Sequence, residues 1–477
     1  MEKLPDIKTN FAEWYQEVVY SAELVDQSPT AGCFVIRPYG YSLWENIQKI
    51  LDEEIKKTGT VNAYFPLLIP ESFFKKEKEH VEGFAPELAV VTHAGGKKLE
   101  EPLVVRPTSE TIIYYMFAKW IKSWRDLPLK VNQWANVVRW EMRPRAFLRT
   151  REFLWQEGHT AHETKEGATQ MAQDMLHIYK NFVENYLAIP AVAGIKTENE
   201  KFAGADRTFA IEGLMKDGKG LQLGTSHVLS HNFSKSFDIL YQGKDGKMES
   251  PHCSSWGITT RLIGAIVMSH GDEKGLVFPP KIAPFAVVIV PIFRKEEEKA
   301  AVLEKVEQLT KSLKDKNIKF YVDADETKTP GSKFFHWEHK GVPLRVEIGP
   351  KDVANNNLVL VSRVMLEGEN QKNIISFDNA AGSIESTLQK IQNQMFKNAK
   401  ENLNSNWNQA EFLEEFGPKL EASNGLFQVG FCGNKECELK LKEFKATTRC
   451  RLAEKKHAKC FACKCESTGD VLVAKAY

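Results

Sequence analysis

Residues 131–162 constrain the fold of this chain most, because they predict two strands whose inner face is polar. On the first strand, Val137, Arg139 and Glu141 alternate onto one face. Pro144 lies in the charged connector that follows, which is typical of a hairpin loop. The second strand places arginine, aromatic, carboxylate and imidazole side chains on one face: Arg149, Arg151, Phe153, Trp155, Glu157 and His159. A half-buried strand normally presents aliphatic side chains there, so the hairpin is predicted to form the floor of a binding pocket.

Length and composition limit the class of protein. A chain of 477 residues is too long for one core and predicts two to four domains. Lys and Arg number 64 against 63 Asp and Glu, so we expect no DNA partner, and any other nucleic acid must contact local patches. The N-terminus has no apolar signal region, and no apolar run approaches the ~20 residues of a membrane helix. We therefore expect a cytoplasmic protein with no membrane partner.

The first 280 residues predict helices and strands around the hairpin. Apolar residues recur at helical spacing over residues 11–24 and 41–57. Residues 63–70 (AYFPLLIP) are apolar, but Pro66 and Pro70 cannot donate to a ladder, so the segment is an edge strand or packs on another surface. A dimer contact and plain core packing explain it equally well.

The pattern changes after the proline-rich linker at residues 279–284. Strands alternate with helices over about a hundred residues, which is typical of a separate small α/β domain. A polar break at residues 402–408 then precedes a cysteine-bearing tail. We expect three domains, at residues 1–280, 285–395 and 402–477.

Six of the eight cysteines lie in that tail, and their spacing predicts a metal site. Cys432-x4-Cys437 and Cys460-x2-Cys463 are two close pairs separated by a loop, so four thiolates can converge on one tetrahedral zinc ion. Cys450 and Cys465 are also present, and Cys463-x-Cys465 competes as a pair. With no position open for chemistry, we expect a structural site.

Two sequence patterns bear on the binding of phosphate and of ions. The glycine-rich segment at residues 213–219 nearly matches a phosphate-binding loop, but Gly220 stands where a hydroxyl is needed, so it is a loop between strands. Arg139, Arg149 and Arg261 lie on strand-like segments far apart in the sequence. Together with Glu110, Glu157 and His159, these arginines predict a site for an anion rich in phosphate and for a zwitterion.

Several segments together resemble one family over the whole chain. The segments are RPTSET (residues 106–111), RWE (139–141), FLRTREFLWQEGHT (147–160), LQLGTSH (221–227), SSWGITTRLIGA (254–265) and AYFPLLIP (63–70). They are similar to the class II prolyl-tRNA synthetases that carry a zinc-bearing C-terminal domain. The resemblance implies an α+β catalytic domain on an antiparallel sheet, an α/β anticodon-binding domain and a small zinc-binding α+β domain. It also favours the dimer interpretation of residues 63–70, and hence a homodimer.

The resemblance implies roles for individual residues. The proline site would comprise Thr108, Glu110, Arg139, Trp155, Glu157, His159, Phe202 and His227. The ATP site would comprise Arg139, Glu141, Arg149, Thr150, Phe153, Gln222, Thr225, Thr259 and Arg261, with Mg²⁺ on the phosphates. Arg139 and Arg261 would be catalytic. Zinc would be held by Cys432, Cys437, Cys460 and Cys463, and residues 285–395 would read the anticodon of tRNA(Pro).

The implied activity is ATP-dependent attachment of L-proline to tRNA(Pro) through prolyl-adenylate. A non-catalytic tRNA-binding relative is the rival from another class, but it should have lost Arg139, Glu110 or Arg261. A synthetase for another amino acid, such as threonine, is the nearer rival. Only about forty residues separate the hairpin from residue 202, which leaves no room for an inserted editing domain. A pocket alone rejects a smaller amino acid by roughly 1–3 kcal/mol per methylene, so we expect weak activation of alanine and cysteine.

Overall fold

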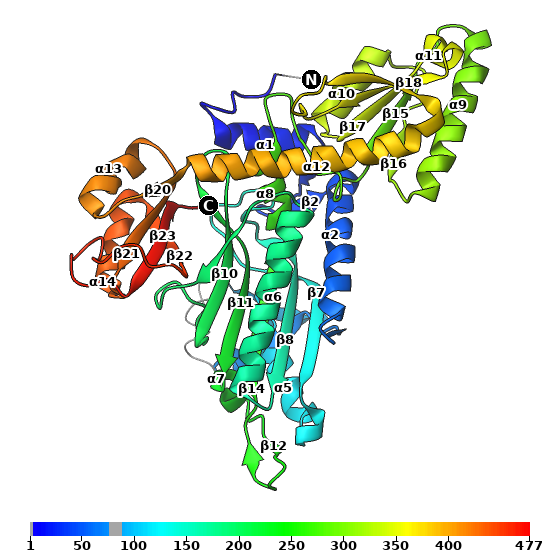
Figure 1. Cartoon of the computed structure of the whole chain (residues 1–477). Helices are drawn as coiled ribbons and strands as arrows, with labels where there is room; N and C mark the ends of the chain where they lie inside the picture. Colours follow the sequence, from blue (N-terminus) through cyan, green and yellow to red (C-terminus); the bar gives the residue numbers. More distant parts are fainter. Residues whose placement is uncertain (1–2, 76–87) are drawn as a thin grey trace.

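The computed structural model describes residues 3–75 and 88–477, and it is built around one large sheet (Figure 1). Its strand order is β20-β21-β23-β22-β9-β10-β11-β14-β8-β7-β3. The first 280 residues contribute the strands β3 (Val61–Asn62), β7 (Leu129–Val138), β8 (Glu152–His162), β9 (Val192–Ile195), β10 (Arg207–Leu214), β11 (Gly220–Ser230) and β14 (His252–Thr259). All pair antiparallel except β3, which is parallel to β7. The expected antiparallel sheet is confirmed.

Helix α6 (Lys165–Asn185) covers the face of this sheet opposite the predicted pocket, and α2 (Pro38–Lys56) packs beside it. Helix α8 (Arg261–His270) packs against β11 and β14, and α1 (Phe11–Ser21) packs against α8. Helix α6 lies along β10, β11 and β14. It begins at Thr164, whose hydroxyl accepts the Gly167 amide, and it buries Met171, Met175 and Tyr179 in the largest core. On the pocket face, polar side chains line the cavity, and a second apolar cluster beside them packs against α5 (Glu110–Trp120) and α7 (Asn232–Ser236).

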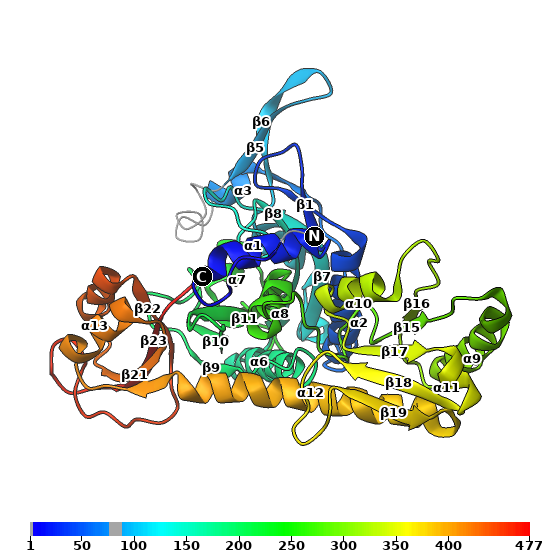
Figure 2. The same ribbon diagram turned by 90° about the horizontal axis from the view of Figure 1, so that it is seen from above.

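Shorter elements complete the first 280 residues. A three-stranded sheet, β4-β6-β5, forms the hairpin that projects from the molecule in Figure 2, with glycines 95 and 96 in its turn at φ +58° and +76°. The strands of this sheet are β4 (Leu68–Pro70), β5 (Ala89–Ala94) and β6 (Lys97–Val105), and the helices next to it are α3 (Glu71–Lys75) and α5 (Glu110–Trp120). The remaining ones are β1 (Val25–Gln27), β2 (Phe34–Ile36), a 3-10 turn (Trp124–Asp126), α7 (Asn232–Ser236), β12 (Tyr241–Gln242) and β13 (Met248–Glu249).

A second sheet, ordered β16-β15-β17-β18-β19, forms the predicted α/β part. Its elements are β15 (Val287–Pro291), α9 (Glu296–Asp315), β16 (Phe320–Val322), α10 (Pro330–His339), β17 (Leu344–Ile348), α11 (Pro350–Ala354), β18 (Asn357–Ser362), β19 (Lys372–Ser376), a 3-10 turn (Phe377–Asn379) and α12 (Ala380–Ser405). Strand β19 was not predicted, because it is an edge strand without a buried residue and lacks the apolar alternation that marks the inner strands.

The C-terminal part extends the large sheet. Its elements are β20 (Trp407–Gln409), α13 (Leu413–Ala422), β21 (Leu426–Phe431), α14 (Lys435–Leu439), a 3-10 turn (Lys440–Phe444), β22 (Ala446–Arg451) and β23 (Gly469–Lys475). Strand β22 joins β9 where Arg451 pairs with Ile195. The expected break at residues 402–408 was wrong in part, since α12 continues to Ser405 and buries Leu403 against the C-terminal strands. The long α12 thus runs from one part to the other (Figures 1 and 2), and the three domain ranges stay a prediction.

Gly158 on β8 is required by close packing. A Cβ at this position would lie 2.1–2.4 Å from ring atoms of Trp256, which is buried on the neighbouring strand β14. Overpacked cores typically lose 1–3 kcal/mol. We expect Gly158→Ala to lower the free energy of unfolding by roughly 2–3 kcal/mol, measured by urea unfolding. Gly331→Ala is the control, because its Cβ meets nothing within 4 Å; a loss no larger than the control's would contradict the prediction.

Candidate active site

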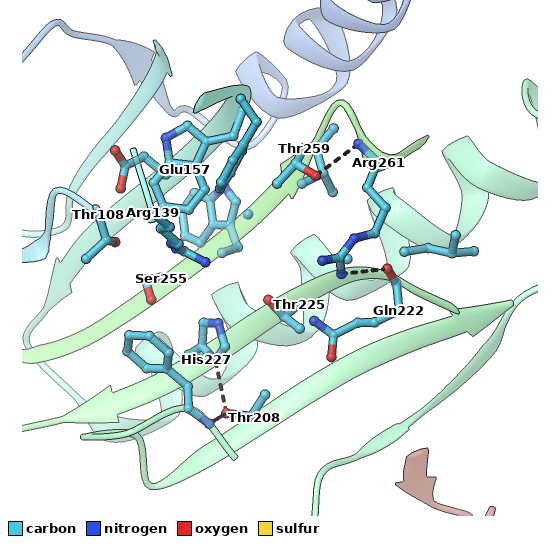
Figure 3. A pocket seen from close by; sticks show the side chains of 18 of the residues that line it. Thr108, Arg139, Glu157, Thr208, Gln222, Thr225, His227, Ser255, Thr259 and Arg261 are labelled. Carbon is cyan, nitrogen blue, oxygen red and sulfur yellow. Dashed lines mark hydrogen bonds between the residues drawn. The ribbon is translucent and has the colours of Figure 1, made fainter. Parts of the chain in front are cut away.

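One cavity of about 400 Å³ lies on the open face of the large sheet (Figure 3). Every residue assigned above to the proline or ATP site lines this cavity. They come from three strands (β8, β11 and β14), from the connection between β7 and β8, from the loop between β9 and β10, and from the starts of α5 and α8 with the turn before α5. Residues as distant in the sequence as Thr108 and Arg261 therefore face the same space. Whether each residue has its expected role stays a prediction.

The β7–β8 pairing explains how the hairpin contributes. Alternate residues of β8, from Phe153 to His159, face the cavity, and Gln133 and Glu157 are directly paired across the two strands. The strands end at Val138 and Glu152, so Arg139 follows β7 immediately, and its backbone N–H donates to the Arg151 carbonyl at 2.8 Å.

Beyond the strands, the predicted alternation is wrong. Both Arg149 and Thr150 line the cavity, whereas Arg151 does not. The Arg151 guanidinium donates to the carbonyl of Ala31 at 2.7 Å and lies 4.2 Å from the centre of the Trp140 ring. The period of two fails here because residues 139–151 form an irregular connection rather than continued strands.

One end of the cavity is acidic and buried. Glu157 is 2% exposed and accepts hydrogen bonds from Gln133 Nε2 at 2.9 Å and from the Ser109 amide at 3.3 Å. The Thr108 hydroxyl donates to the Glu110 carboxylate. A ligand atom from each of Glu110, Glu157 and His159 lies within 4.8 Å of the other two. Two carboxylates and an imidazole this close together suit a cation or ammonium group.

His227 and Phe202 form another wall of the cavity, with ring centres 4.6 Å apart. Thr208 connects them, because its hydroxyl lies 2.9 Å from His227 Nδ1 and also accepts the Phe202 amide at 2.9 Å. Neither Thr208 nor Ser255 was predicted from the sequence, although both line the cavity. Strand register could have found them, since Thr208 pairs with His227, and Ser255 pairs with both His227 and His159.

The other end of the cavity gathers three arginines. Arg139 donates through Nε to the Pro107 carbonyl at 3.0 Å, and its guanidinium lies 5.4 Å and 5.5 Å from the ring centres of Phe153 and Trp155. Arg149 lies 3.7 Å from the Glu141 carboxylate. Stacked and hydrogen-bonded guanidinium groups are held in fixed orientations, which suits bidentate contacts with phosphate.

The third arginine, Arg261, has a lowered pKa. Burial, together with the positive charges of Arg149 and Arg139, lowers the pKa of Arg261 to about 10. Its backbone N–H donates to Thr259 Oγ1 at 3.0 Å and its Nη1 to the Gln222 carbonyl at 3.4 Å, while its Nε has no hydrogen-bond partner within residues 3–75 and 88–477. Mutually repelling cations in a cavity favour a polyanion, which would restore their charge balance.

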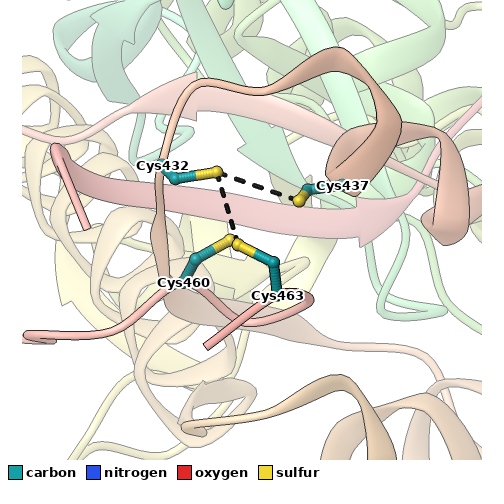
Figure 4. Close-up of side chains that lie close together, drawn as sticks. All are labelled: Cys432, Cys437, Cys460 and Cys463. Carbon is teal, nitrogen blue, oxygen red and sulfur yellow. Dashed lines mark hydrogen bonds between the residues drawn. The ribbon is translucent and has the colours of Figure 1, made fainter. Parts of the chain in front are cut away.

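Four cysteines gather in the C-terminal part, away from this cavity (Figure 4). The sulfur atoms of Cys432, Cys437, Cys460 and Cys463 all lie within 4.8 Å of one another. Cys432 Sγ is 3.8 Å from both Cys437 Sγ and Cys463 Sγ. A tetrahedron with Zn–S bonds of about 2.3 Å has edges of about 3.8 Å, so these distances fit zinc.

The other two cysteines do not join the cluster. Cys450 is buried in a separate core with Leu214, Leu426 and Leu472. Cys465 is exposed, and its backbone carbonyl accepts the Cys460 amide. The four-residue set implied by the resemblance is therefore the set whose sulfur atoms converge.

Three family models match the chain in sequence. Residues 92–270 match the tRNA synthetase class II core domain (G, H, P, S and T), and residues 286–387 match an anticodon-binding domain. Residues 413–477 match the C-terminal domain of prolyl-tRNA synthetase.

Curated relatives are similar over their whole length. Proline–tRNA ligase 2 of Clostridioides difficile is 48% identical over 480 residues, covering 100% of this chain and 98% of the relative. The proline–tRNA ligase of Natranaerobius thermophilus is 49% identical, covering 98% and 96%. That of Chloroherpeton thalassium is 49% identical and covers 100% of both chains.

Proposed function

The chain belongs to the class II prolyl-tRNA synthetase family, and from that premise we infer which residues handle each substrate. It attaches L-proline to tRNA(Pro) using ATP. Proline and ATP first form prolyl-adenylate with release of pyrophosphate, and the prolyl group then passes to the terminal adenosine of the tRNA. The observation that carries the assignment is the polarity of the cavity, which is acidic at one end and rich in arginine at the other.

Proline occupies the acidic end in this proposal. Its secondary ammonium is held by Thr108 and Glu110, next to the buried carboxylate of Glu157. Its ring packs between Trp155 and the wall formed by Phe202 and His227, and His159 completes the pocket. The hydrogen bonds that Gln133 and Ser109 donate to Glu157 fix this carboxylate in place.

ATP occupies the arginine end. Adenine stacks on Phe153, and the residues that contact the nucleotide are Arg139, Glu141, Arg149, Thr150, Gln222, Thr225, Thr259 and Arg261. ATP binds such sites with Mg²⁺, which offsets phosphate charge when bound, and Glu141 offers the oxygen ligands that Mg²⁺ prefers. At the arginine end, Arg139 is the arginine next to Trp155 of the proline pocket, so it is placed where the carboxylate of proline meets the α-phosphate.

The reaction follows from this placement. A carboxylate oxygen of proline attacks the α-phosphorus, and the bond to the leaving pyrophosphate breaks. Both reactants are anions, so the enzyme must position them against their repulsion and stabilise the negative charge that concentrates on the α-phosphate. Arg139 and Arg261, the two catalytic residues in this proposal, are cations fixed before the substrates arrive.

Pyrophosphate exchange with a panel of amino acids tests the assignment. Proline should support the fastest exchange, with alanine and cysteine slower but detectable. Arg139→Ala should lower proline-dependent exchange about 100-fold, because one preorganised charge donor is lost. The control is Arg143→Ala, since Arg143 is exposed and lies outside the cavity lining. Exchange by Arg139→Ala at the rate of the control would refute the roles given to the arginines.

Zinc in this proposal is structural and is held by Cys432, Cys437, Cys460 and Cys463. The four sulfur atoms surround a common point at the spacing that tetrahedral zinc requires, which leaves no ligand position for a substrate. Reduced thiols also fit the cytoplasm, where we place this enzyme.

Metal analysis of cysteine variants tests the ligand set. Cys432→Ser should lower the zinc content from about one ion per chain to near zero, because thiolate binding is lost and three ligands hold zinc weakly. Cys465→Ser is the matched control and should keep its zinc. Inductively coupled plasma mass spectrometry of the purified proteins gives the content. Loss of zinc from the control, or its retention by Cys432→Ser, would assign the ligands differently.

The part that matches the anticodon-binding domain, residues 286–387, is proposed to read the anticodon of tRNA(Pro). No helix in the described part of the chain is long and apolar enough to cross a bilayer.

A homodimer is proposed from the apolar surface around β3 and β4. Five side chains there are between 40% and 71% exposed: Val61, Tyr64, Leu68, Val90 and Trp120. Strand β3 is also the edge of the large sheet. Exposed apolar patches and open edges usually mark an interface. Analytical ultracentrifugation should find a dimer at micromolar concentration that Tyr64→Glu dissociates; a monomeric wild-type protein would contradict the proposal.

A further inference from the structure

The segment between β9 and β10, residues 196–206, contributes Glu200 and Phe202 to the lining of the cavity. It is an irregular loop whose backbone turns back on itself, with the amides of Glu200 and Lys201 donating to the Thr197 carbonyl. At its far end, the Phe202 amide donates to Thr208 Oγ1. The position of Phe202 in the cavity therefore depends on how the near end of this loop, at Thr197, is held.

Glu438 of the C-terminal part holds that near end. The Thr197 hydroxyl donates to Glu438 Oε1 at 2.6 Å, and Asn199 Nδ2 donates to Glu438 Oε2 at 2.5 Å. The Thr448 hydroxyl of β22 donates to the same carboxylate. Glu438 is 6% exposed, so its charge is taken out of water and compensated by these three donors. Both carboxylate oxygens are engaged, and this fixes the orientation of the group.

The C-terminal part can pack against β9 and β10 without Glu438, because other contacts also join them. Glu212 of β10 accepts Arg449 Nη2 at 2.7 Å and Lys196 Nζ at 2.8 Å, and all three side chains are buried. Strand β22 also pairs with β9. What Glu438 adds is two hydrogen bonds to the loop itself. Its neighbour in α14 is Cys437, one of the four clustered cysteines, so the order of the cluster and the position of Glu438 are linked.

We propose that Glu438 is a positioning residue for proline binding, which ties the loop of residues 196–206 to the cysteine cluster and so holds Phe202 against the substrate. This rests on the proposed assignment of Phe202 to the proline end. A loop already ordered before binding costs less to immobilise when the substrate arrives, so proline affinity should depend on this contact. ATP, which has no residue on this loop in the proposed site, should be unaffected.

Steady-state pyrophosphate exchange by the full-length protein provides the first test. Glu438→Gln keeps the size of the side chain but turns an amide N–H₂ toward a donor. It should raise the KM for proline between about threefold and tenfold, with kcat and the KM for ATP within about twofold. Asn199→Ala should act in the same direction, and since Asn199 is exposed, folding should be preserved. Asn424→Ala is the control, because it removes a contact between the same two parts, to the Asp217 carbonyl, away from the loop.

Hydrogen exchange and metal content separate positioning from instability. Amides of residues 197–206 should exchange faster in Glu438→Gln and Asn199→Ala than in the wild type or Asn424→Ala, while zinc content is unchanged. Unchanged proline KM in Asn199→Ala and Glu438→Gln, or an equal rise in the KM for ATP, would overturn the inference. Phe202→Ala separates a failure of the proline site from a failure of the role given to Glu438. If Phe202→Ala raises the proline KM while Glu438→Gln and Asn199→Ala do not, only the role of Glu438 is refuted. If Phe202→Ala also leaves that KM unchanged, the proline site itself is misassigned.

Discussion

The antiparallel pairing of β7, β8, β14, β11 and β10 is the constraint on which the rest of the molecule depends. Backbone hydrogen bonds across these strands fix the register, and the register fixes which side chains face the cavity. Glu157, Ser255 and His227 lie on neighbouring strands for this reason. A one-residue slip of β8 would turn Glu157 and His159 toward the aliphatic core under α6. The buried charges of the site are tolerable only because the same register supplies their partners.

Charge is separated along the cavity, and this separation is built into its scaffold. The acidic end depends on the buried Gln133 and on the turn before α5, whereas the basic end depends on the connection between β7 and β8 and on the start of α8. Burial and the neighbouring charges of Arg149 and Arg139 lower the pKa of Arg261 to about 10. In the proposed site, binding of the ATP phosphates would relieve that repulsion, so the fold would prepare part of the affinity before the nucleotide enters.

The C-terminal part is more than an appended module. Its strands continue the large sheet through β22 and β9, and α12 joins it to the part that matches the anticodon-binding domain. Its cysteine cluster lies one residue from Glu438, which contacts the loop that carries Phe202. In the proposed function a zinc ion would stabilise this part of the chain, and Glu438 would connect its order to the cavity.

Local sequence was enough to predict much of this protein. Period-two alternation predicted the cavity face of β8, the spacing of the cysteines predicted a metal site, and the resemblance selected its four cysteines and the other expected site residues. Alternation failed at Arg151, and it could not reveal Thr208, Ser255 or the contact of Glu438 with Thr197. The physical reason is that periodicity encodes which face of a strand is buried, but not which strands pair. Only the tertiary structure, through register and through contacts across more than two hundred residues, decided which side chains meet.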